Sequence, residues 1–197
     1  ADYEKAFRQY LSLYYELKAG YQSMELHEQY IKTLLGLIYA CIAVNQNDIV
    51  RIALKELKNI PEINPHISYI KAESLAFFPL IRCALSGDFY NGLTAVEIIE
   101  AFLQENNDKI TPAQFFYAYY YAAYIYLGHG NNALALKYLR KIDEYQLRDL
   151  LPNLKLAMKI MEIIIFYDQQ KVDLMESRLR SLQRQVQKEA NVKAFML

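Results

Sequence analysis

The segment from Thr111 to Ile142 constrains the fold more than any other part of the chain, because it reads as a complete pair of helices. Thr111 can cap a helix, Pro112 suits the first helical position, and the Gln114 side chain can reach back to the cap. Apolar and aromatic residues then occupy every side of the helix as far as Gly128-His129-Gly130, where a left-handed turn costs little. The second helix of the pair is amphipathic, with one charged face.

Similar turns recur along the chain at a nearly regular interval of about 40 residues. They are expected near Asn47, Gly87, Gly130 and Gln169. The 6 glycines and 5 prolines fall mostly where apolar periodicity breaks, which indicates helices joined by short turns and no β-strand. Regularly spaced helix pairs are typical of an α-solenoid. The sequence therefore predicts an all-α fold of about four helix pairs, organised as a single repeat domain over residues 1–197.

Charge and termini limit the location and the partners of the chain. The 22 basic and 22 acidic residues balance, so no nucleic acid is expected as a partner. The solidly apolar part of the longest uncharged stretch covers about 14 residues, short of the roughly 20 that span a bilayer. The N-terminus lacks the form of a signal peptide, which favours a cytoplasmic protein. The absent initiator methionine and the apolar end, Ala194 to Leu197, suggest a piece of a longer protein.

The residues that usually carry chemistry are few and scattered. Cys41 and Cys83 lie far apart in apolar helical surroundings, so we expect two small core residues and neither a disulfide nor a metal site. The three histidines have no metal-ligand spacing and are expected on the surface or in turns: His27, His66 and His129. No nucleotide-binding or nucleophile motif is present. The sequence therefore predicts no catalytic residue, no metal, no cofactor and no enzyme.

The central helix pair resembles the tetratricopeptide repeat at most of the positions that define that motif. The matching residues are Tyr119, Ala122, Ala123 and Tyr126 in the first helix, and Ala135, Leu139 and Ile142 in the second. The same register places Cys41 and Ala53 at the two small positions of the preceding pair, with Pro65 as its closing proline. Two of the four pairs carry the resemblance. It implies a right-handed superhelix, with helices or turns longer than the family's usual 34-residue repeat provides.

The resemblance also implies where a binding surface would lie. Tyr117, Tyr120 and Tyr124 would line the inner, concave side of the first helix, with Tyr121 beside them. Tyrosine offers a large contact area and a hydroxyl group at little cost in rotamer entropy, so it suits recognition. Alternatively, these rings fill the interface between neighbouring helix pairs.

The corresponding inner positions of the other pairs are apolar. They are Leu35, Ile38 and Ile42 in the first pair, and Ala157, Ile160 and Ile164 in the last. The family's basic clamp for a terminal carboxylate would need Lys, Arg and Asn there. The groove therefore takes an apolar helix or segment, or the superhelix is so tight that these residues form core.

These observations favour a scaffold module that binds a protein or peptide segment through an aromatic and apolar concave face. The tyrosines Tyr117, Tyr120, Tyr121 and Tyr124 are the candidate partner-binding residues. The alternative from another class is a ligand- or peptide-sensing domain of a larger regulatory protein. A helical enzyme is the third hypothesis, and it would require carboxylates or histidines that converge in a polar pocket.

Overall fold

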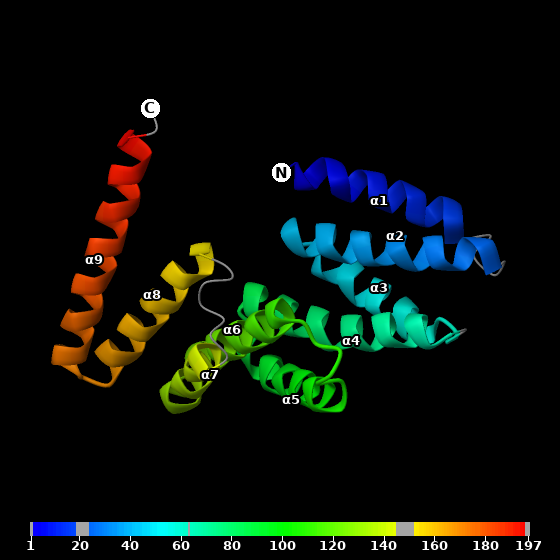
Figure 1. Cartoon of the computed structure of the whole chain (residues 1–197). Helices are drawn as coiled ribbons and strands as arrows, with labels where there is room; N and C mark the ends of the chain where they lie inside the picture. Colours follow the sequence, from blue (N-terminus) through cyan, green and yellow to red (C-terminus); the bar gives the residue numbers. More distant parts are fainter. Residues whose placement is uncertain (1, 19–23, 63, 145–151, 196–197) are drawn as a thin grey trace. The chain divides into compact units, whose positions relative to one another are not determined.

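The computed structural model describes residues 2–18, 24–62, 64–144 and 152–195, and within these ranges every regular element is an α-helix. The prediction of an all-α chain is confirmed for this described part. In chain order the helices are α1 (Tyr3–Lys18), α2 (Met24–Ala43), α3 (Asn47–Asn59), α4 (Pro65–Ser86), α5 (Phe89–Glu105), α6 (Pro112–Gly128), α7 (Asn132–Glu144), α8 (Pro152–Asp168) and α9 (Val172–Phe195) (Figure 1).

The chain divides into two compact units. Unit 1 is Ala1–Glu105 with helices α1 to α5, and unit 2 is Asn106–Leu197 with helices α6 to α9. Within the units, consecutive helices pack as the pairs α2 with α3, α4 with α5, α6 with α7, and α8 with α9. This arrangement is compatible with a helical repeat. The prediction of a single repeat domain over residues 1–197 stays a prediction.

All four pairs turn in the same way. One residue of each turn takes a left-handed conformation, with φ of 60° at Asn45, 72° at Gly87, 82° at Gly130 and 57° at Gln170. The amide after each of these residues donates to the carbonyl five positions back, for example from Asp88 N to the Cys83 oxygen at 3.0 Å. This pattern is the Schellman motif, which satisfies the last carbonyls of a helix. In every pair the second helix begins two residues after the left-handed residue.

The left-handed residues give a direct measure of the repeat. From 45 to 87, from 87 to 130 and from 130 to 170 the intervals are 42, 43 and 40 residues. The predicted interval of about 40 residues agrees with this spacing. The left-handed residues of the first and last turns, Asn45 and Gln170, lie within two residues of Asn47 and Gln169, near which these turns were expected.

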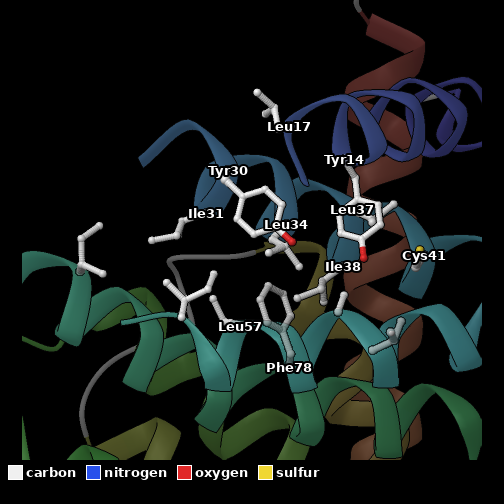
Figure 2. Close-up of a cluster of buried hydrophobic side chains, with 14 residues drawn as sticks. Tyr14, Leu17, Tyr30, Ile31, Leu34, Leu37, Ile38, Cys41, Leu57 and Phe78 are labelled. Atoms are coloured by element: carbon white, nitrogen blue, oxygen red, sulfur yellow. The ribbon is translucent and has the colours of Figure 1, made fainter. Parts of the chain in front are cut away.

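The core of unit 1 lies between α1, α2, α3 and α4. Figure 2 shows the α2 side chains at its centre, among them the fully buried Leu34, Ile38 and Cys41. The cluster consists of Tyr14, Leu17, Tyr30, Ile31, Leu34, Leu37, Ile38, Cys41, Val50, Ala53, Leu57, Ile60, Ile67 and Phe78. Burial of one such large side chain contributes roughly 1.5–3 kcal/mol to the free energy of unfolding. Because Tyr14 and Leu17 of this cluster belong to α1, that helix is part of the core although it is not one of the paired helices.

Helix α6, the first helix of unit 2, begins with the predicted cap at Thr111. The Thr111 hydroxyl accepts from Gln114 N at 3.3 Å, and Gln114 Oε1 accepts from Thr111 N at 2.7 Å. This reciprocal capping box satisfies two amides that the first helical turn leaves unpaired. Ala123 and Ala135 are both fully buried, which allows α6 and α7 to approach closely. Their burial is compatible with the small residues expected at the helix crossing of a repeat.

Ile52 is exposed on α3, whereas its neighbour Ala53 is buried. Adjacent helical residues point about 100° apart, so one apolar face need not include both. His27 was expected at the surface or in a turn, but its side chain is buried in α2. His66 and His129 are exposed as expected.

Candidate functional site

The four candidate tyrosines lie together on one side of α6, and two of them are clearly open to solvent. Tyr117 is 36% exposed and Tyr124 is 39% exposed, while Tyr120 and Tyr121 are partly buried. The ring centroids of Tyr117 and Tyr121 are 6.4 Å apart in a stacked arrangement, and those of Tyr120 and Tyr121 are 5.3 Å apart, edge to face. The rings therefore brace one another along the helix.

This tyrosine face points away from the partner helix. Tyr119 and Tyr126 contact α7 through Tyr138, with ring centroids 6.2 Å and 5.4 Å apart. At 3.6 residues per turn, Tyr117 and Tyr124 lie on the opposite side of α6 from that pair. From Phe115 to Ile125, every residue other than the four tyrosines is buried, including Ala122 and Ile125. The tyrosine face is thus the accessible side of α6.

Helix α8 extends this surface with apolar residues. Ala157, Ile160 and Ile164 stand 13, 10 and 6 residues before the left-handed Gln170, as Tyr117, Tyr120 and Tyr124 do before Gly130. Ile160 is 44% exposed and Ile164 is 42% exposed. Helices α6 and α8 contact each other, and the two sets of side chains hold equivalent positions on them. We call them the inner surface: Tyr117, Tyr120, Tyr121 and Tyr124 of α6, and Ala157, Ile160 and Ile164 of α8.

The inner surface carries no charge, and α6 contains no charged residue at all. The charges of the third pair lie on α7, where Lys137 and Arg140 are exposed. Lys141 Nζ lies 4.8 Å from the ring centroid of Tyr138, a cation–π contact on the α7 side of the pair. Burial raises the pKa of Tyr120, and the neighbouring Tyr124 raises it further. The Tyr120 hydroxyl therefore stays protonated at neutral pH and can donate a hydrogen bond.

In the first pair the predicted inner positions do not form a surface. Ile38 is fully buried, and Leu35 and Ile42 pack against the unit 1 core. Counted back from Asn45, the positions equivalent to the α6 tyrosines are residues 32, 35 and 39, so the predicted set stood three residues too late. Residues three apart share a helix face, which is why apolar periodicity did not reveal the shift. The predicted positions of the first pair are therefore core, whereas Lys32 and Tyr39, which are equivalent to Tyr117 and Tyr124, are exposed.

The same alignment corrects the register of the small residues. Cys41 and Ala53 are both buried, but the positions equivalent to Ala123 and Ala135 are Ile38 and Val50. A larger pair of side chains therefore fills that crossing in the first pair.

A polar cluster in unit 1 was not anticipated. Glu56 Oε1 of α3 accepts from Tyr14 Oη at 2.7 Å and from Lys18 Nζ at 2.5 Å, and both donors belong to α1. Its other oxygen accepts from Tyr30 Oη of α2 at 2.6 Å. Figure 2 shows Tyr14 and Tyr30 close to each other within the core, and their rings stack 6.1 Å apart. One carboxylate thus ties three helices together.

The electrostatics of this cluster suit a structural clamp. Burial opposes the ionised form of Glu56, but the hydrogen bonds from Lys18, Tyr30 and Tyr14 outweigh it and lower the pKa of the carboxyl group. The hydrogen bond to Glu56 likewise raises the pKa of Lys18. A carboxylate that is held ionised, with both oxygens engaged, is a poor proton donor at neutral pH. Sequence separations of 26 to 42 residues hid the cluster from sequence reasoning.

A second unanticipated set of polar contacts joins α8 to α9. The buried Lys159 donates from Nζ to Gln185 Oε1 at 2.8 Å, and the buried Glu162 carboxylate pairs with Arg178 Nε at 3.0 Å. The α8–α9 contact is therefore partly ionic, whereas α6 and α7 meet through aromatic rings. A lysine and a glutamate three residues apart on a helix gave no signal that they would be buried.

Among the described residues, no group of histidine, cysteine or acidic side chains could hold a metal ion. None of the helices in the described ranges is long and apolar enough to cross a membrane. Comparison of the chain with protein-family models, with curated proteins and with solved structures gives no match.

Proposed function

We propose that unit 2 is a tetratricopeptide-like binding module that holds an uncharged segment of another protein against the inner surface. The observation that carries this proposal is the exposure of Tyr117, Tyr124, Ile160 and Ile164 on two helices that contact each other. Large apolar side chains that gather in an exposed patch are typical of an interaction site. The four equivalent Schellman turns and the small residues at the α6–α7 crossing support a repeat frame of this kind.

Tyrosine and isoleucine would share the work of binding. Tyrosine is enriched among the residues that dominate binding energy, and its ring loses little rotamer freedom when it is covered. The stacked pair Tyr117 and Tyr121 is already ordered before a partner arrives. Preorganisation of this kind lowers the entropic cost of association. The isoleucines would add apolar area without requiring hydrogen bonds.

The test is a selection of peptides from a random library on the purified chain. Enriched peptides are then measured against Ile164→Asp, which places a charge on the inner surface, and against Tyr90→Ala as a matched control. Tyr90 is an exposed tyrosine of α5, outside the inner surface. We expect Ile164→Asp to weaken binding at least about tenfold and Tyr90→Ala to leave it unchanged.

Thermal unfolding of each variant, followed by circular dichroism, shows whether the fold is kept. A selection that enriches no peptide contradicts the proposal. So does a set of enriched peptides that bind wild type and Ile164→Asp equally well while both remain folded.

A further inference from the structure

We propose that the segment recognised by the inner surface is proline-rich and binds as a polyproline II helix. This inference rests on the proposed function, because it names the class of segment that the same surface would hold. It is carried by the row of tyrosine rings on α6, by the absence of charged residues from that helix and by the hydrogen-bonding character of the tyrosine hydroxyls.

The spacing of the exposed rings fits this conformation. Tyr117 and Tyr124 lie seven residues apart on one helix face, which corresponds to about 10.5 Å along the axis. A polyproline II helix repeats every three residues, or about every 9.3 Å, so side chains three apart in such a segment meet successive exposed rings. Tyr121 stands between them and stacks on Tyr117, so three tyrosine rings follow one another along this face, and pyrrolidine rings can pack against the exposed parts of Tyr117 and Tyr124.

The hydrogen-bonding groups are complementary as well. A polyproline II segment forms no internal hydrogen bonds, so its carbonyls need external donors, and its prolines have no amide hydrogen that would need an acceptor. The inner surface offers tyrosine hydroxyls, among them those of Tyr117 and Tyr120, and contains no carboxylate. Neutral hydroxyl donors therefore pair with neutral carbonyl acceptors, and binding does not require the desolvation of a charged group on the inner surface or on the peptide.

Other peptide conformations match less well. A β-strand ligand gains its affinity by pairing with an exposed sheet edge, and the accessible side of α6 presents side chains only. An amphipathic helix satisfies its own carbonyls and would make little use of the tyrosine hydroxyls. The charges that border the apolar stripe of such a helix would also find no counter-charge on α6. Docking of proline-rich segments on aromatic grooves is a general mode of recognition.

The experiment measures three fluorescent probes by anisotropy with the purified chain. The first is a neutral peptide of about twelve residues with the repeat Pro-Pro-Ala, long enough for four turns of polyproline II. The second replaces every proline by alanine and glutamine, and the third is an amphipathic helix of similar length. We expect the proline probe to bind at least about tenfold more tightly than either of the others.

Variants then locate the bound probe. Tyr124→Ala is expected to weaken the proline probe about tenfold, and Tyr124→Phe, which removes the hydroxyl alone, about threefold. Tyr90→Ala serves again as the control and leaves binding unchanged. Equal affinity of wild type and a folded Tyr124→Ala for the proline probe overturns the inference.

The remaining outcomes separate this inference from the proposed function. If the helical probe binds instead and Ile164→Asp abolishes its binding, the polyproline assignment is wrong while the binding function stands. Library peptides without proline that require the inner surface would likewise overturn the polyproline assignment alone. If no probe binds and the library enriches nothing, both proposals fail together.

Discussion

The first and third helix pairs share one turn geometry, yet different groups cover the equivalent position in the middle of their first helices. Gly36 of α2 and Tyr121 of α6 both stand nine residues before their left-handed residue. The Tyr10 ring of α1 lies directly over Gly36, so closely that a β-carbon there would overlap it. In the third pair the helix supplies its own ring at that position, through Tyr121. An aromatic ring therefore lies at this helix position in both pairs. In the first pair the ring belongs to Tyr10 of α1, and in the third it belongs to Tyr121 of α6 itself.

Helix α1 is held over the first pair by its apolar side chains and by the Glu56 clamp, and its Tyr10 ring covers Gly36 of α2. This cover is local, because Lys32 and Tyr39 of α2 are exposed, and the turn alignment makes them equivalent to Tyr117 and Tyr124. The two pairs therefore differ at one helix position, which another helix covers in the first pair and the helix's own tyrosine occupies in the third.

The largest expected effect compares two isoleucines that the sequence treated alike. Ile38→Ala removes a fully buried side chain from unit 1 and is expected to lower the free energy of unfolding by about 2–5 kcal/mol. Ile164→Ala, on the exposed part of α8, is expected to cost less than about 1 kcal/mol. Urea unfolding of both variants makes the measurement. Equal losses would mean that the two positions do not differ as core and surface.

The Glu56 clamp tests how α1 is held in place. Glu56→Gln keeps the shape of the side chain but removes the charge that three donors share, and we expect a loss of about 2 kcal/mol. The control is Glu62→Gln, because Glu62 is an exposed partner of Lys71 at 3.3 Å and its loss should cost less than about 0.5 kcal/mol. A Glu56 variant as stable as its control would show that α1 is held by apolar packing alone.

The same clamp predicts a dependence on pH. The pKa of Glu56 is lower in the folded chain than its ordinary value of 4.5, so its contribution to stability is present above that value and is lost as the pH falls through the folded pKa. The pKa of Tyr14 is raised, by burial first, above its ordinary value of 10.0, so its contribution is lost only as the pH rises past that range. Urea unfolding between these limits should show a constant difference between wild type and Glu56→Gln. That difference should shrink below about pH 4.

The sequence predicted the helices and their pairing because both depend on local signals. A few neighbouring residues are enough to determine a cap such as Thr111 and turns such as those at Gly87 and Gly130. The register of the first pair was missed because Asn45 takes the left-handed conformation that glycine usually supplies. The clamp could not be foreseen, since Tyr14, Tyr30 and Glu56 meet only after three helices have packed.

The candidate site was predicted in part, and for a related reason. The tyrosines of α6 stand out in composition, and their shared face follows from helical periodicity. Which residues of a helix stay exposed depends on the register of that helix, and apolar periodicity alone did not fix it. Apolar periodicity placed both Ile164 and Ile38 on an inner face, but Ile164 stands six residues before its left-handed residue and Ile38 stands seven before its own, at the position that is buried in the third pair as Ala123.

A smaller effect probes the contact between Tyr10 and Gly36. Alanine favours a helix over glycine by about 1 kcal/mol, but here its β-carbon would meet the Tyr10 ring, with Cδ1 at 2.8 Å. We expect Gly36→Ala to destabilise the wild-type chain by about 1 kcal/mol and to stabilise a Tyr10→Ala chain by a similar amount. A double-mutant cycle from urea unfolding measures this reversal. If Gly36→Ala has the same effect in both backgrounds, the ring does not rest on the glycine.

The smallest expected effect concerns the turns that make the two pairs comparable. Gly130 adopts its left-handed conformation freely, whereas Gln170 adopts the equivalent one with φ of 57° and a side chain that disfavours it. Gln170→Gly should therefore raise the free energy of unfolding by roughly 0.5–1 kcal/mol, and Gly130→Ala should lower it by a similar amount. The control is Gln183→Gly on the exposed side of α9, where glycine inside a helix should cost about 1 kcal/mol. Destabilisation by Gln170→Gly, measured by thermal unfolding, would mean that this turn does not follow the Schellman geometry of the other three.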